Sequence, residues 1–324
     1  MSRHVKVVAC LLVLTPTILA AADVQSHLDA ARSAAGTRWA GKVDGLCRPG
    51  GSDRPDPTAN VSRPVTLPEV PNWPEPAARI FDNVYFVGSK GVSAFAITTS
   101  EGIIITDAMW AYDVERSVVG GLNSLGIDPA GIRYIIVPHG HPDHYGGANL
   151  LRDTFGAKIV APRGDLETIK VYAKRDTTPV PKAYDMLVGE GDTLTLGGTT
   201  VTFHEMPGHT PGGVVMSFPV AADGKMHRML IWAAGGMTPN SAEKLQVQIP
   251  ALRRLIGQAA ASGVDVLADN HGSHVLVEAM SANPNGGNLF LVGHDAVVGY
   301  LKMRLECDEA RVAAQQRGSR ASPF

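Results

Sequence analysis

The chain has 324 residues, of which 44% are hydrophobic and 19% charged, a composition that excludes an intrinsically disordered protein and is typical of one large or two small packed domains. Its 29 Lys and Arg and 31 Asp and Glu leave a formal net charge of −2, which argues against nucleic acid as a partner. Eleven His accompany only three Cys, so any metal site should use imidazole and carboxylate ligands rather than thiolates.

The first 22 residues have the layout of a secretory signal. Basic residues come first, an apolar run follows over Val7–Leu14, and small residues end the segment at Ala20–Ala22. We therefore expect a signal peptide at residues 1–22, a periplasmic or secreted location, and no membrane insertion after its removal. The surroundings of Cys10 superficially resemble a bacterial lipidation box, but the apolar run comes mostly after this cysteine, so the lipoprotein interpretation is the weaker one.

Residues 23–78 are predicted to form a short helix, Val24–Trp39, followed by a Pro-rich arm. Eight prolines between residues 47 and 77 prevent a continuous helix or a central strand there. After signal removal two cysteines remain, Cys47 and Cys307. An even number in an oxidising compartment favours a disulfide between the arm and the last helix, and two separate buried thiols are the alternative.

Residues 79–324 are predicted to form one domain with two β-rich blocks, each followed by helices. Short apolar runs between turn residues indicate strands, and longer amphipathic runs indicate helices. The expected strands are residues 80–87, 93–99, 103–106, 132–137, 158–161, 192–195, 200–205, 214–218, 228–232 and 264–268, and the expected helices are residues 113–125, 147–155, 165–175, 249–261 and 295–315. This order predicts a layered α/β fold with two sheets face to face and helices outside.

Four candidate metal ligands lie within six residues of each other, directly after the predicted strand at residues 132–137. They are His139, His141, Asp143 and His144, residue types that suit zinc. Six adjacent positions can hardly close around a single ion. In an extended loop His139 and His141 can face one metal, while Asp143 and His144 begin the next turn and can face a second.

The motif His139-x-His141-x-Asp143-His144 resembles the signature of the metallo-β-lactamase superfamily, and the resemblance runs from about Phe81 to the last helix. It implies a four-layer αβ/βα sandwich with a two-metal site at one edge. The segment Pro207–Gly213 resembles the next family motif and contributes His209, and Asp269-Asn270-His271 resembles the last one and contributes His271. The resemblance thus implies two zinc ions, one held by His139, His141 and His209 and the other by Asp143, His144 and His271.

This ligand set is similar to that of the third subclass of class B β-lactamases, which uses no cysteine ligand, and it implies a role in antibiotic resistance. Many hydrolases of the superfamily, such as the glyoxalase II type, place a bridging Asp after the strand that here ends near Trp232, where this chain has Gly. Asp107 resembles the family's structural Asp beside the metal loop and could orient an imidazole, or it could be an ordinary turn residue. His204, His227 and His274 match no motif and are expected to be structural or surface residues, although His274, three residues beyond His271, could line the pocket.

The resemblance implies that a hydroxide bridging the two zinc ions attacks the amide carbonyl of a β-lactam ring, with Asp143 as the catalytic residue that orients it. Thr238, Asn240 and Ser241 could hydrogen-bond this small-molecule substrate. A lactonase or another ester or thioester hydrolase of the same fold is the alternative, and a non-catalytic zinc-binding protein would use the same ligands. Nothing in the sequence selects an oligomeric state.

Overall fold

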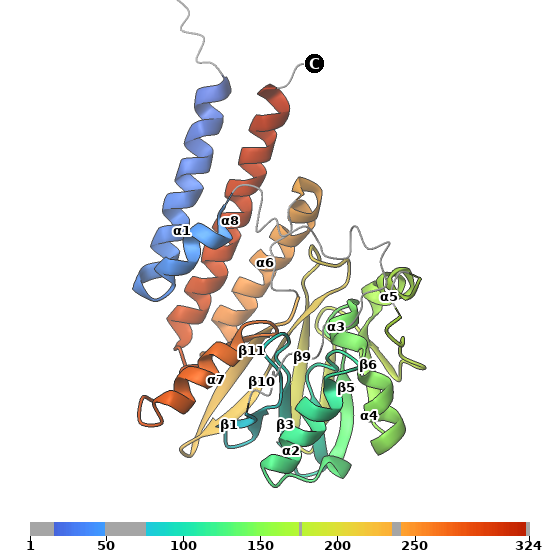
Figure 1. Cartoon of the computed structure of the whole chain (residues 1–324). Helices are drawn as coiled ribbons and strands as arrows, with labels where there is room; N and C mark the ends of the chain where they lie inside the picture. Colours follow the sequence, from blue (N-terminus) through green and yellow to red (C-terminus); the bar gives the residue numbers. More distant parts are fainter. Residues whose placement is uncertain (1–15, 49–75, 175–176, 235–240, 322–324) are drawn as a thin grey trace, which may run out of the picture.

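The computed structural model describes residues 16–48, 76–174, 177–234 and 241–321. Two β-sheets lie face to face in this part of the chain, and helices cover the outer face of each sheet (Figure 1). The predicted αβ/βα sandwich is therefore confirmed. The predicted signal lies mostly, and the Pro-rich arm almost entirely, outside the described residues.

The first sheet has seven strands in the order of the chain. They are β1 (Ala78–Phe81), β2 (Val84–Phe86), β3 (Phe95–Thr99), β4 (Gly102–Ile105), β5 (Ile132–Ile136), β6 (Lys158–Pro162) and β7 (Met186–Val188). Strands β1 to β4 are antiparallel and β4 to β7 are parallel. Because parallel strands end at the same edge of a sheet, the loops after β4, β5 and β6 lie together.

The second sheet has five strands in the order β12-β11-β10-β9-β8. They are β8 (Thr193–Leu196), β9 (Thr199–Glu205), β10 (Val214–Ala222), β11 (Lys225–Trp232) and β12 (Val266–Asp269). The first four form an antiparallel meander, and β12 pairs with β11 in parallel. The ends of β11 and β12 therefore lie side by side, as those of β4 to β6 do.

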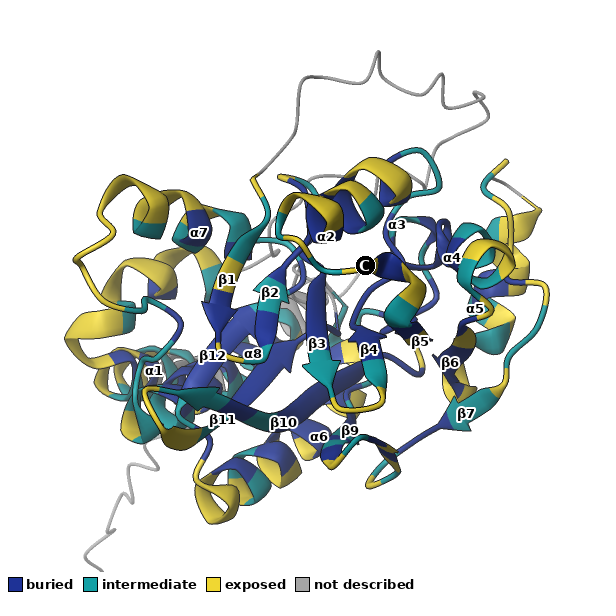
Figure 2. Cartoon of the chain, turned by 90° about the horizontal axis from the view of Figure 1, so that it is seen from below, coloured by how far each residue is buried: buried dark blue, intermediate teal, exposed yellow. Residues whose placement is uncertain are grey.

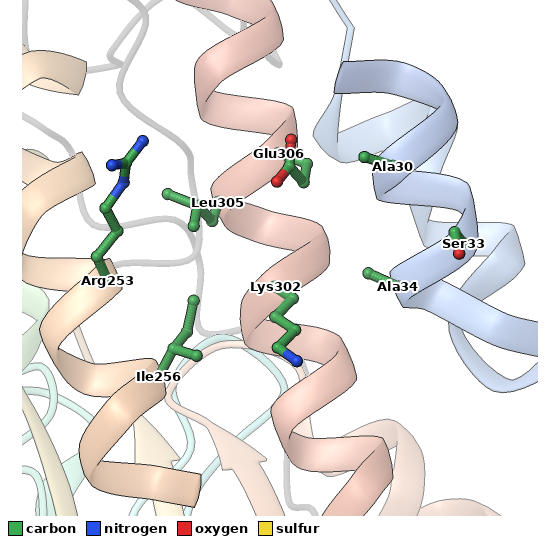
Figure 3. Close-up of a pocket in the computed structure, with 8 residues that line it drawn as sticks. All are labelled: Ala30, Ser33, Ala34, Arg253, Ile256, Lys302, Leu305 and Glu306. Atoms are coloured by element: carbon green, nitrogen blue, oxygen red, sulfur yellow. The ribbon is translucent and has the colours of Figure 1, made fainter. Parts of the chain in front are cut away.

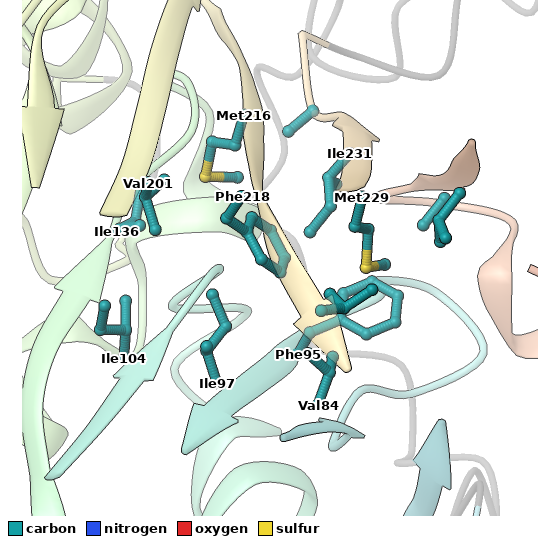
Figure 4. Close-up of a cluster of buried hydrophobic side chains, with 14 of the residues drawn as sticks. Val84, Phe95, Ile97, Ile104, Ile136, Val201, Met216, Phe218, Met229 and Ile231 are labelled. Carbon is teal, nitrogen blue, oxygen red and sulfur yellow. The ribbon is translucent and has the colours of Figure 1, made fainter. Parts of the chain in front are cut away.

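The core between the sheets consists of alternate residues from the facing strands. In β3, Phe95 and Ile97 point into this core, whereas Ala96 packs among the helices on the other face. From the second sheet Met216 and Phe218 fill the same space (Figure 4). Most central strands are dark blue in Figure 2 because both faces are covered, which explains their nearly continuous apolar sequences.

Helices α3 (Pro142–Tyr145), α4 (Ala148–Phe155) and α5 (Leu166–Ala173) belong to the first sheet's side. The helix expected at residues 113–125 is a π-helical turn, Glu115–Val119, followed by α2 (Gly120–Ser124). Gly120 and Gly121 lower the intrinsic stability of an α-helix there, so burial of Val118 and Leu122 supports this segment. The single turn of α3 and the three-residue strand β7 are too short for a periodic sequence pattern to predict.

The second sheet is covered by α6 (Ala242–Ser262) and α8 (His294–Ala321), with α7 (Ser273–Ala282) beside them. The sequence predicts this helix to start at Ile249, but α6 begins seven residues earlier, where the Ser241 side chain accepts a hydrogen bond from the Lys244 amide. Pro250 lies inside this helix without ending it. None of the helices in the described part of the chain is both long and apolar enough to cross a membrane.

The N-terminal helix is longer than expected. α1 covers Pro16–Leu46 and folds back on itself at Gly36, whose φ of 52° favours glycine. Before Gly36 the helix runs antiparallel to α8, with His27 paired to Glu306; after it the chain reverses, and Trp39 packs on Tyr300. The predicted disulfide between Cys47 and Cys307 is present. The helical part of residues 23–78 is thus packed against the domain.

Candidate metal centre

All six candidate ligands come together at the edge of the sandwich where strands of both sheets end. Four of them follow β5, His209 lies between β9 and β10, and His271 follows β12. They form two groups of three in which all ligand atoms lie within 4.8 Å of one another: His139 with His141 and His209, and Asp143 with His144 and His271. The structure therefore brings together the residues that the resemblance assigns to each metal.

Backbone conformation directs the four ligands after β5 toward two places. His141 is extended, with φ −91° and ψ 151°, and Pro142 then starts the single turn of α3. His139 and His141 consequently lie on an extended loop, whereas Asp143 and His144 lie on a helical turn. Proline is suited to the first helical position because its missing N–H has no partner to lose there.

In the first cluster, His139 is completely buried. Its Nδ1 donates to the Ala233 carbonyl at 2.9 Å, and its Nε2 has no hydrogen-bond partner among the described residues. Nδ1 of His141 lies 3.0 Å from Nε2 of His209. Burial, with the neighbouring rings, holds the pKa of His139 well below its usual value and lowers the pKa of His209 to about 3. Both rings therefore stay neutral and keep a lone pair for a metal.

In the second cluster, Nε2 of His144 lies 3.2 Å from Nε2 of His271 and 3.2 Å from the Asp143 carboxylate. Nδ1 of His271 donates to the Gly91 carbonyl at 2.9 Å, which turns its Nε2 toward the cluster. Burial alone would raise the pKa of Asp143, but the surrounding His144, His271 and His141 rings hold it below its usual range. Asp143 is thus a carboxylate at neutral pH.

Asp107, at the end of β4, orients His144. Its Oδ2 lies 2.6 Å from Nδ1 of His144, and its Oδ1 accepts the Met109 amide at 2.8 Å. Met109 has φ 55°, a region that bulky residues rarely adopt. Burial alone would lower the pKa of His144, but the Asp107 and Asp143 carboxylates raise it to about 10. The short contact fixes Nδ1 as the donor and leaves Nε2 for the cluster.

Both clusters fit a zinc ion. Two ligand atoms that each lie about 2.05 Å from a tetrahedral zinc are about 3.3 Å apart. The distance between Nδ1 of His141 and Nε2 of His209 is 3.0 Å, which is close to this value. The distance between the Nε2 atoms of His144 and His271 is 3.2 Å. The buried, unpartnered Nε2 of His139 is otherwise unfavourable, and a metal ligand role explains it. Imidazole and carboxylate donors without thiolate are a common zinc set.

Thr238 and Asn240, two of the three predicted substrate residues, lie outside the described residues. Ser241 is described, and its hydroxyl caps α6. Of the histidines without a motif, His204 bridges Gln258 and Ser217, and His227 binds Asp265.

Several residues near the clusters had no motif to mark them. Asp165 follows β6 as Asp107 follows β4, and its carboxylate accepts hydrogen bonds from the loops of the first cluster. The available signal for Asp165 was an acidic residue three positions after β6, a buried strand that the sequence predicts.

Aromatic rings also lie near the clusters. The ring of Tyr172 lies 4.8 Å from that of His141, and Trp110 stacks on Tyr112 at 5.7 Å. Burial, with the charges of Asp113 and Asp143, raises the pKa of Tyr112 to about 12.

A cavity of about 520 Å³ lies elsewhere, between α1, α6 and α8 (Figure 3). Ala30, Ile256 and Leu305 contribute apolar surface to it, and Lys302 and Glu306 contribute charges. No residue that lines it belongs to either cluster.

A family model described as the metallo-beta-lactamase superfamily matches residues 87–221. Among curated proteins, the chain is 37% identical over 81 residues to a hydroxyacylglutathione hydrolase of Hyphomonas neptunium, covering 25% of this chain and 27% of that protein. A hydroxyacylglutathione hydrolase of Rhizobium meliloti is 30% identical over 105 residues, covering 32% of this chain and 35% of that protein. The chain thus matches only about a third or less of the length of these relatives.

Solved structures match over a much larger part of the chain. BJP-1, a subclass B3 metallo-beta-lactamase of Bradyrhizobium japonicum, is 26% identical and has a TM-score of 0.60, covering 75% of this chain and 96% of that one. The native FEZ-1 metallo-beta-lactamase from Legionella gormanii is 20% identical with a TM-score of 0.58, covering 76% and 95%. At that lower identity the likeness concerns the fold alone.

Proposed function

We propose that this chain, whose residues 87–221 match the metallo-β-lactamase superfamily model, is an exported hydrolase of that superfamily that binds two zinc ions and opens β-lactam rings. The observation that carries the proposal is the pair of three-residue clusters without a cysteine ligand, the ligand set that the third subclass of class B enzymes also uses. Supporting it, the likeness to BJP-1 extends over 96% of that chain.

A bound zinc pair supplies an activated water nucleophile near neutral pH and polarises a carbonyl oxygen. His139, His141 and His209 would hold one ion, and Asp143, His144 and His271 the other. The ionised Asp143 carboxylate would accept a hydrogen bond from the nucleophilic water and orient it toward the substrate carbonyl. Asp107 keeps the His144 ring in place through its 2.6 Å contact.

A thioester or other ester hydrolase is the second candidate. It is favoured by the hydroxyacylglutathione hydrolases, which match 25% and 32% of this chain. The glyoxalase II type uses a bridging Asp after the strand that here corresponds to β11, where this sequence has Gly235 and Gly236. Because this Asp is missing from the sequence, a β-lactam is the first candidate substrate and a thioester the second.

A panel of three chromogenic substrates tests the proposal: a cephalosporin, a lactone and a glutathione thioester. We expect zinc-dependent hydrolysis of the cephalosporin with the highest kcat/KM. The His141→Ala variant should lose at least about 100-fold in rate, since it removes a ligand of the first ion. Asp185→Asn is the matched control, because the Asp185 carboxylate accepts a hydrogen bond from the Ile159 amide and belongs to neither cluster. Preferred hydrolysis of the thioester or lactone would support the second candidate, and inactivity on all three would contradict both.

Export is proposed on two grounds. Residues 1–22 have a signal layout, and a disulfide joins Cys47 to Cys307, which suits an oxidising compartment. Periplasmic or secreted protein whose mass corresponds to a chain that begins at Asp23 would support this part of the proposal, and an uncleaved intracellular protein would contradict it.

A further inference from the structure

The loops that carry the three histidines of the first cluster share one buried carboxylate, Asp165. Asp165 is 0% exposed and lies just after β6. Its Oδ2 accepts the Gly140 amide at 2.7 Å and the Thr210 hydroxyl at 2.6 Å, and its Oδ1 accepts the Gly212 amide at 2.7 Å. Hydrogen bonds to an ionised acceptor are about twice as strong as neutral ones.

These bonds connect two loops that are far apart in the sequence. Gly140 lies between His139 and His141, and Thr210 directly follows His209. The first loop follows β5 of one sheet, and the second joins β9 to β10 of the other. One side chain therefore holds the backbones on both sides of the first cluster.

Both loops lie in close contact with the segment that carries Asp165, with no space for a side chain at Gly140 or Gly212. A Cβ on Gly212 would overlap the backbone of Gly164 and Asp165, and a Cβ on Gly140 would lie 2.9 Å from the Thr168 side chain and 3.0 Å from the Asp165 carbonyl oxygen. The glycines allow both loops to approach within hydrogen-bond distance of the carboxylate. No described ligand atom of either cluster hydrogen-bonds to Asp165 directly.

We propose that Asp165 is a positioning residue that sets the geometry of the His139, His141 and His209 site and thereby its metal affinity. Asp107 acts on the second cluster through His144, whereas Asp165 acts on the first through the backbone of two loops. The inference rests on the metal binding contained in the proposed function, but not on the substrate.

The test measures zinc affinity at each site by competition with a chromophoric chelator. The His271→Ala background isolates the first site, and the His209→Ala background isolates the second. In Asp165→Asn the side-chain amide would face an N–H or O–H donor where an oxygen now accepts. We expect first-site affinity to fall by about 10- to 100-fold and second-site affinity to stay unchanged, with a shifted Co(II) absorption spectrum at the first site only.

Asp185→Asn is the matched control and should bind zinc like wild type at both sites. Equal affinities in Asp165→Asn and wild type would overturn the inference, as would an equal loss at both sites in a folded protein. If Asp165→Asn does not fold, the same affinities are measured in Thr210→Val and Thr210→Ser. The valine variant, which lacks the hydroxyl, should bind zinc more weakly at the first site, and the serine variant should keep the wild-type affinity. A valine variant that binds zinc like wild type would overturn the inference.

The two proposals can fail separately. A wild-type protein that binds two zinc ions but hydrolyses no β-lactam would contradict the proposed function and leave the role of Asp165 testable by affinity alone. An active protein whose Asp165→Asn variant keeps full first-site affinity would contradict only the role of Asp165.

Discussion

His144 differs from the other buried ligands because two carboxylates flank it. Its Nδ1 contacts Asp107 and its Nε2 contacts Asp143, at 2.6 Å and 3.2 Å. His139 and His209 instead face other rings and stay neutral. Without metal, the two carboxylates favour the protonated His144 ring by raising its pKa, and a metal that binds at Nε2 must displace that proton.

We predict that His144 in the metal-free protein titrates near pH 10, as its raised pKa indicates. The protonated ring stabilises the fold fully below its usual pKa of about 6.5, and this contribution is lost as pH rises toward the folded value. Nitrogen NMR of the His144 ring across this range measures the titration. Asp107→Asn should lower the pKa because it removes one of the two charges, and a wild-type ring that is neutral at pH 7.5 would contradict the prediction.

At the scale of elements, a disulfide joins Cys47, the residue directly after α1, to Cys307 of α8. The first half of α1 packs Ala31 and Ala35 into the cluster that also contains Val297 and Leu301 of α8. After the reversal at Gly36, Cys47 is bonded to Cys307. The helix is thus part of the layer outside the second sheet, although the sequence predicts only a short helix and an arm.

We predict that replacing Cys47 and Cys307 together with alanine lowers the free energy of unfolding by about 2 to 4 kcal/mol, because the crosslink closes a loop of 260 residues. Denaturant titration measures the loss, and zinc affinity should not change since α1 contributes no residue to either cluster. Reduction of the wild type should reproduce the effect. An unchanged unfolding midpoint in the double variant would show that helix packing alone holds α1.

At the scale of the whole molecule, the metal centre lies across the two halves of the sandwich. In each cluster two residues follow β5 of the first sheet, and the third follows a strand of the second sheet. An ion bound in either cluster therefore connects loops of both sheets, and its binding energy stabilises the folded chain as a unit.

Zinc removal should lower the melting temperature of the whole domain in one transition. At a free zinc concentration 100 times the dissociation constant, each site should stabilise the fold by about 2.7 kcal/mol. Calorimetry with and without a chelator measures the difference. Magnesium should not restore the melting temperature, because this ion prefers oxygen ligands. The increase in melting temperature on adding zinc should be smaller in His141→Ala. An identical melting temperature with and without zinc would speak against metal binding in the native fold.

Apolar runs and local motifs were sufficient to predict most strands, the layered fold and the six candidate ligands, but residues 80–87, expected as one strand, form the antiparallel pair β1 and β2. The strands β3 and β4 were predictable because burial on both faces leaves a run of three apolar residues in each. His139, His141, Asp143 and His144 were recognisable because their spacing is local. Short elements such as α3 and β7 offered too few residues for a period to appear, and the extended length of α1 depends on its packing against α8.

The sequence by itself determined which residue types could bind a metal and that the chain forms two sheets with helices outside. Only the tertiary structure decided how residues distant in sequence meet: Asp107 with His144, and Asp165 with the loops of His139 and His209. The physical reason is that periodicity and turn chemistry act over a few residues, whereas a buried carboxylate takes its hydrogen-bond donors from whichever strand ends the fold brings to it.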